Sequence, residues 1–205
     1  PGLFPQFSIL DPQVITTLPK RQIANGIADA FTHVMEQYLT FPAGGLLQDR
    51  LAESILQTLI EVGPEVLENP KDYTAASNFM WSCTMALNGL IQKGVPTDWA
   101  IHAMGHELTA LYGIDHARTL AILASSHYTY NLESKKEKLA QFGRRVWNIE
   151  GDTNKEIAIS AIEKTDDFFH SLGIDTKLSL YTDKASETPA KIANAFEQRG
   201  WVAIG

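Results

Sequence analysis

Apolar residues recur with the 3.6-residue period of an α-helix in every long segment of this chain after residue 19. Glycine, proline and other residues that favour turns separate these segments. The pattern predicts helices over 21–40, 46–67, 73–92, 98–111, 116–132, 135–147, 153–172 and 189–199. We therefore expect an all-α fold, a multi-helix domain that occupies residues 20–205.

Residues 1–19 follow a different pattern. Residues 4–12 are typical of a short extended segment that a turn at Asp11-Pro12 closes. Residues 14–19 form a second stretch, rich in β-branched side chains and ending at Pro19. We expect this N-terminal segment to be extended.

The composition excludes several classes of protein. The 205 residues are 44% hydrophobic and 20% charged, as in an ordinary globular domain rather than a disordered or fibrous chain. A formal net charge of −7 offers no basic surface for a nucleic acid, and no apolar run is long enough for a membrane span. The single cysteine, Cys83, cannot form an internal disulfide, which fits a reducing compartment. We expect a cytoplasmic protein with no nucleic-acid or membrane partner.

The segment 98–111 contains two histidines on an unusually apolar helix. Its apolar residues lie on two sides, which is typical of a central, buried helix, so we expect His102 and His106 to point inward. His116 follows a turn and begins the next predicted helix. Asp29 and His33 form another pair at i, i+4, a spacing that places both side chains on one helix face.

Histidines with a carboxylate at helical spacing suggest a metal site. A lone buried histidine is more often a hydrogen-bonded core residue than a ligand, so any one of these residues carries little weight. Three histidines within fifteen residues, together with an inward Asp29/His33 pair, favour a shared metal. One carboxylate with several imidazoles suits Fe(II) or Zn(II) better than a hard cation.

Two stretches carry a more specific signal. Residues 25–38 read NGIADAFTHVMEQY and residues 102–116 read HAMGHELTALYGIDH. Both resemble the metal-binding signature of the iron-containing (group III) alcohol dehydrogenases. Residues 88–99 and the ELTA stretch at 107–110 are similar to the branch of NADP-dependent butanol dehydrogenases and aldehyde reductases.

This resemblance implies roles for individual residues. His106 matches a histidine near the nicotinamide and the metal that is not itself a ligand, and it is our candidate for the catalytic proton shuttle. Thr17 falls where the linker between two domains touches the cofactor. The implied cofactors are Fe(II) or Zn(II), with NADP or NAD in the intact protein. The implied metal ligands are Asp29, His33, His102 and His116.

Members of this family also have an N-terminal α/β domain that binds the nucleotide, and this sequence does not contain it. Gly44-Gly45 is no substitute for a phosphate-binding loop, because it lies between two predicted helices with no strand before it. We expect residues 1–19 to be the residual strand and linker of that missing domain. We expect the helical domain, 20–205, to be truncated at its C-terminus.

The resemblance implies the metal-binding catalytic half of an NAD(P)-dependent alcohol dehydrogenase or aldehyde reductase. It would catalyse reversible hydride transfer between NAD(P)H and small aldehydes or primary alcohols, with the metal polarising the substrate oxygen. The full-length protein is expected to be a homodimer, and this fragment alone to be inactive.

Two other functions remain open at this point. One is a helical metal-dependent phosphohydrolase, although the adjacent His-Asp pair typical of such enzymes is missing: Asp115-His116 has the opposite order. The other is a non-catalytic helical interaction module.

Overall fold

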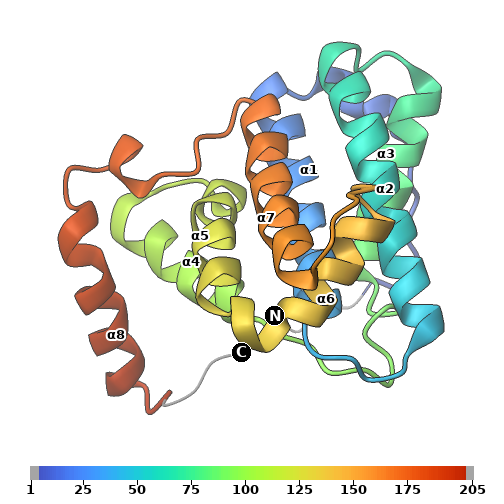
Figure 1. Ribbon diagram of the computed structural model, residues 1–205. Coiled ribbons are helices and arrows are strands. Elements are labelled where there is room, and N and C mark those ends of the chain that lie inside the picture. The colour runs from blue at the N-terminus through green and yellow to red at the C-terminus, as the bar shows by residue number, and fades with distance from the viewer. Residues whose placement is uncertain (1–4, 202–205) are drawn as a thin grey trace.

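The computed structural model of the protein describes residues 5–201, and every regular element within that range is a helix (Figure 1). Three are short 3-10 helices: η1 (Pro12–Thr17), η2 (Leu178–Leu180) and η3 (Ala185–Glu187). The longer ones are α1 (Lys20–Tyr38), α2 (Leu46–Glu68), α3 (Tyr73–Leu87), α4 (Ala100–Tyr112), α5 (His116–Tyr130), α6 (Leu132–Arg145), α7 (Asn154–Ser171) and α8 (Thr188–Gln198). The predicted all-α fold is confirmed.

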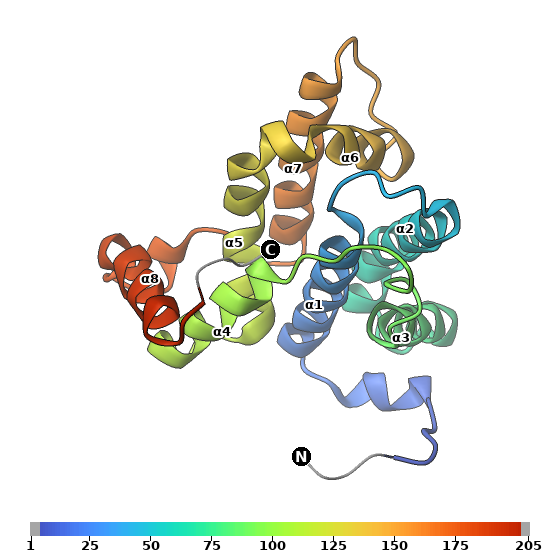
Figure 2. The ribbon, with the colours of Figure 1, turned by 90° about the horizontal axis from the view of Figure 1, so that it is seen from below.

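The central element is α1. It packs against α2 and α3 on one side and against α5 on another, and most of its side chains are buried. Figure 2 shows α1 between the α2/α3 pair and the α4/α5 pair, while α8 lies at the outer edge of the molecule. The prediction that 98–111 is the central helix is therefore wrong, because α4 packs chiefly on α5 and exposes residues such as His106 and Leu111.

Local chemistry explains where the helices begin and end. Asp72 caps α3 by accepting hydrogen bonds from the backbone N–H groups of Thr74 and Ala75, and Thr153 forms a capping box with Glu156 at the start of α7. Helix α3 ends at Leu87, five residues earlier than predicted, because Gly89 adopts a left-handed conformation with φ of +79°.

The N-terminal segment differs from the prediction at residues 12–17. They form η1 instead of an extended stretch, because the Asp11 side chain accepts a hydrogen bond from Gln13 N–H at 2.9 Å and Pro12 occupies the first turn. Burial of Ile15 holds η1 against the helical body, where it packs on α3. Residues 5–11 are in no regular element, and residue 4 lies outside the described range.

Helices α4 and α5 approach each other closely at Gly105. A Cβ atom there would lie 2.8 Å from Thr119 Oγ1 and 3.0 Å from Leu120 Cδ2, so only glycine allows this distance between the helices. The close approach brings His102 on α4 next to His116 at the start of α5.

Within residues 5–201, none of the helices combines the length and the apolar character that a membrane crossing requires.

Candidate metal centre

Three helices bring the predicted ligands together. Asp29 and His33 lie one turn apart on α1, His102 is in the first turn of α4, and His116 is the first residue of α5. Gly113, in the left-handed conformation with φ of 67°, ends α4 and turns the chain back, so that His116 returns toward His102.

The distances between these side chains are short. His33 Nε2 and His116 Nε2 each lie 3.7 Å from an Asp29 carboxylate oxygen. Asp29, His102 and His116 each offer a ligand atom within 4.8 Å of the other two, and these are the three residues that form a metal-sized group among residues 5–201. His33 completes the set, since its ring centroid lies 4.2 Å from that of His102.

Several polar atoms in this cluster are buried without a hydrogen-bond partner. They include Asp29 Oδ1, His102 Nε2 and His116 Nδ1. Buried polar groups are nearly always paired, so orphaned atoms of three potential ligands in one place fit a bound cation. The donor set therefore fits a metal ion.

The electrostatics of the imidazoles point the same way. Burial lowers the pKa of His102 to about 4, even though the Asp29 charge opposes the shift. Burial is also the main cause that lowers the pKa of His33 and of His116. All three rings are therefore neutral near pH 7, and a neutral imidazole is the form that binds metals.

Sequence reasoning assigned no role to Glu36, which contacts the His102 ring at the nitrogen that does not face Asp29. The Glu36 side chain is almost fully buried, and its Oε2 is hydrogen-bonded to His102 Nδ1. Burial raises the pKa of Glu36 to about 8, although the backbone N–H groups of Ile101 and His102 act in the opposite direction. The available signal was the spacing: Glu36 lies seven residues after Asp29, on the same face of α1.

His106 lies beside the cluster and not within it. Its side chain is exposed, which corrects the expectation that both α4 histidines point inward. Its ring stacks on that of His116, with centroids 4.7 Å apart and planes 10° from parallel. His106 thus connects a potential ligand with solvent.

Trp99 covers the cluster on another side. The indole packs edge-on against His33 and His102, with centroid distances of 5.7 and 5.3 Å. Its N–H donates to Thr97 Oγ1 at 3.1 Å, which fixes the ring, and 37% of the residue remains exposed. This partly open aromatic surface suits contact with a small apolar substrate.

Thr17, two of the six histidines and Cys83 lie outside the cluster. Thr17 is exposed at the end of η1, and its hydroxyl donates to the carbonyl of Val14 at 2.9 Å. His127 pairs with Asp98 and His170 lies near Asp166, so both remain outside. Burial raises the pKa of the Cys83 thiol to about 12, which leaves it a poor nucleophile.

Asp98 is the centre of a network of polar contacts at the N-terminus of α4. Its carboxylate accepts hydrogen bonds from Ala100 N–H at 2.8 Å and from His127 Nε2 at 3.3 Å, and it forms an ion pair with Lys135. Burial alone would raise the pKa of Asp98, but the bonds from His127 and Lys135 outweigh it and hold that pKa well below its ordinary range.

We expect Asp98→Asn to lower the free energy of unfolding by about 3 kcal/mol at neutral pH, because Lys135 then loses its buried partner. A carboxylate with a lowered folded-state pKa stabilises the fold above its unfolded pKa of about 3.9 and loses that contribution as the pH falls through the folded value. The difference between wild type and variant should therefore shrink below about pH 4. Urea unfolding of both proteins over this pH range measures it, and a pH-independent difference would contradict the ion pair.

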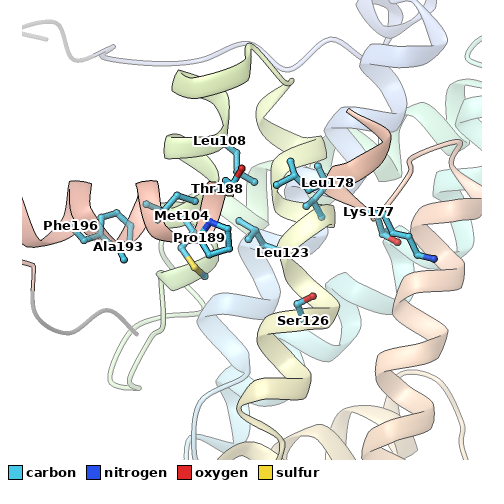
Figure 3. Close-up of a pocket in the computed structure, with 13 residues that line it drawn as sticks. Met104, Leu108, Leu123, Ser126, Lys177, Leu178, Thr188, Pro189, Ala193 and Phe196 are labelled. Atoms are coloured by element: carbon cyan, nitrogen blue, oxygen red, sulfur yellow. The ribbon is translucent and has the colours of Figure 1, made fainter. Parts of the chain in front are cut away.

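Two hollows lie near α4 and α5, and one of them reaches the cluster. An open depression of about 460 Å³ is lined by Asp29 and His116, together with Asn25 and Gly26. An apolar cavity of about 570 Å³ lies on the opposite side of α4, between α4, α5 and α8 (Figure 3). Met104 and Leu108 of α4 face that cavity, so it is separate from the histidines.

Comparison with known proteins decides the family. Residues 23–203 match the family model described as "Fe-containing alcohol dehydrogenase family, C-terminal". This chain belongs to the iron-containing alcohol dehydrogenase family. The resemblance of the two histidine-bearing stretches to that family is therefore confirmed.

The relatives show which branch this member is similar to. The NADPH-dependent aldehyde reductase YqhD of Escherichia coli is 48% identical over 201 residues, which is 98% of this chain and 52% of that protein. NADH-dependent butanol dehydrogenase B of Clostridium acetobutylicum is 42% identical over 181 residues, 87% of this chain and 46% of that protein. The chain thus spans about half the length of these curated relatives.

Solved structures agree with the fold. The substrate- and cofactor-free form of YqhD matches with a TM-score of 0.94 at 47% identity, covering 98% of this chain and 53% of that one. NADH-dependent butanol dehydrogenase A of Thermotoga maritima matches with a TM-score of 0.86 at 29% identity, covering 95% of this chain and 49% of that one.

Proposed function

We propose that this member of the family is the metal-binding catalytic half of an NAD(P)-dependent alcohol dehydrogenase or aldehyde reductase. The observation that carries the proposal is the convergence of Asp29, His33, His102 and His116, with orphaned buried atoms on three of them. Relatives named as aldehyde reductase and butanol dehydrogenase support small aldehydes and primary alcohols as substrates.

Each residue of the centre has a task in this proposal. A metal held there would supply a Lewis acid that polarises the substrate oxygen. Asp29 contributes the negative charge of the ligand set, and the neutral rings contribute nitrogen lone pairs. The open depression beside Asp29 and His116 gives access for the substrate, and the exposed indole of Trp99 would contact its alkyl chain.

His106 is the proposed proton shuttle. Its exposed ring stacks on His116, so it can exchange protons with solvent at the edge of the centre. An imidazole can both donate and accept a proton, which suits proton transfer in both directions of the reaction.

The nucleotide would bind outside this chain for the most part. The relatives are about twice as long, and we propose that a preceding nucleotide-binding domain supplies the site for NADP or NAD, with 1–19 as strand and linker. Thr17 would lie at the cofactor. Both Fe(II) and Zn(II) suit the donor set, and a cytoplasmic homodimer of the full-length protein completes the proposal.

We expect the 205-residue chain to bind Zn(II) or Fe(II) but to show no oxidation of butanol with NADP⁺ or NAD⁺, because the hydride acceptor has no binding domain here. The same residues fused to the nucleotide-binding half should be active. Assays of nicotinamide absorbance on both proteins, each loaded with metal, make the comparison. Turnover by the 205 residues alone would contradict the proposal that a separate domain binds the nucleotide.

The two other functions lack support of this kind. A metal-dependent phosphohydrolase of the histidine–aspartate type needs an adjacent pair in that order, and the chain belongs to a family of alcohol dehydrogenases instead. A non-catalytic interaction module would give no reason for orphaned nitrogen and oxygen atoms on three converging side chains.

A further inference from the structure

We infer that Glu36 is a positioning residue that fixes the tautomer and orientation of His102, so that the Nε2 lone pair faces Asp29. The inference rests on the proposed function, since it concerns the same metal centre. It assigns a role to a residue that the ligand set leaves out.

The Glu36 carboxylate is hydrogen-bonded to three groups of α4: two backbone N–H groups and the His102 ring. Oε1 accepts from Ile101 N–H at 2.7 Å, and Oε2 accepts from His102 N–H at 3.2 Å. Oε2 is also hydrogen-bonded to His102 Nδ1, and only 3% of Glu36 is exposed. One carboxylate therefore binds both the backbone and the side chain of His102.

This arrangement determines which nitrogen can bind a metal. When Nδ1 carries the hydrogen and donates it to Glu36, the lone pair of the neutral ring is on Nε2. His102 Nε2 is the buried nitrogen without a partner, and His102 belongs to the metal-sized group with Asp29 and His116. In the alternative arrangement, Glu36 is protonated and donates to Nδ1, and the ring hydrogen is on Nε2. Nε2 then has no free lone pair and cannot bind a metal ion. A carboxylate behind a ligating histidine commonly selects the first arrangement.

Glu36 also places α4 relative to α1. Trp99, the residue before α4, makes no side-chain cap, so the free N–H groups of Ile101 and His102 depend on Glu36 for their hydrogen bonds. In the arrangement with the hydrogen on His102 Nδ1, Glu36 is ionised, and its negative charge at the N-terminus of α4 is favourable. Helix α1 thus carries Asp29 and His33 and also holds His102.

Glu36→Gln tests the role, because the amide must turn its NH₂ group toward one of these donors. We expect Zn(II) affinity to fall about 10–100-fold in chelator competition. The visible spectrum of the Co(II)-loaded chain should change as well, since it reports ligand geometry. Asp98→Asn is the matched control for loss of a carboxylate at the start of α4, and Glu53→Gln for loss of a buried carboxylate on another helix. Both should destabilise the fold and leave the Zn(II) affinity within about threefold of wild type.

Long-range ¹H–¹⁵N correlation spectra of the metal-free wild type provide a second measurement that does not depend on the folding of any variant. We expect hydrogen on Nδ1 of His102; a hydrogen on Nε2 would overturn the inference. It would also be overturned if Glu36→Gln bound Zn(II) like wild type, or if Asp98→Asn weakened binding equally. A wild type that bound neither Zn(II) nor Co(II) would refute the proposed function, and this inference with it, whereas the first three results would refute this inference alone.

Discussion

Replacing Asp29 or His116 with alanine is expected to weaken Zn(II) binding by more than about 100-fold. Asp29 and His116 each offer a ligand atom within 4.8 Å of one another and of His102, and the His116 Nε2 atom lies 3.7 Å from Asp29 Oδ1. Without Asp29 the site also loses its negative charge, which the neutral imidazoles cannot replace. Isothermal titration of the 205-residue chain, or competition with a coloured chelator, measures the change.

Two histidines outside the ligand set serve as controls. His106→Ala removes a ring that stacks on His116 but does not bind the metal in this proposal. We therefore expect the Zn(II) affinity to fall less than about tenfold, which is the lower limit for residues that support a metal ligand. His170→Ala removes a half-exposed histidine on α7 and should leave the affinity unchanged. Equal losses in His170→Ala and Asp29→Ala would mean that surface histidines account for the binding, and would refute the centre.

Phe31→Ala is expected to lower the free energy of unfolding by about 3–5 kcal/mol. Phe31 is fully buried on α1, and its ring packs against Phe168, Phe169 and Phe142 with centroid distances of 5.3, 5.7 and 6.4 Å. Helices α6 and α7 are thereby joined to the helix that carries Asp29. The large cost follows because three neighbouring rings would line the cavity, and tightly packed cores relax only in part.

Urea unfolding monitored by circular dichroism measures this loss. Tyr130→Ala is the matched control, since Tyr130 is 90% exposed and its removal should change the free energy of unfolding by no more than about 0.5 kcal/mol. Similar values for the two variants would show that the α1 contacts with α6 and α7 contribute little to stability.

The succession of helices was predictable because it depends on local patterns. Apolar residues at helical spacing and turn residues between them place eight helices within a few residues of their observed ends. The predictions were wrong at one helix end and for one element: Gly89 ends α3 early through its left-handed backbone, and the Asp11-Pro12 step begins a 3-10 helix where β-branched residues suggested an extended chain.

The centre was predictable only in part. Family resemblance and the i, i+4 spacing identified the four residues that the fold brings together, although their role as ligands stays a prediction. Periodicity alone led to a wrong orientation for His106, because it treats both sides of an apolar helix as buried, while α4 packs chiefly on one neighbour.

From the sequence alone come the positions of the helices, the α1 pair Asp29 and His33, and the type of chemistry that such residues support. These properties depend on neighbours within one or two turns, and a helical period records them directly. Only the tertiary structure decided that Glu36 holds His102 from 66 residues away, that Trp99 covers the cluster, and that His106 faces solvent. Those contacts join different helices, and they depend on how closely the helices pack, as Gly105 shows for α4 and α5.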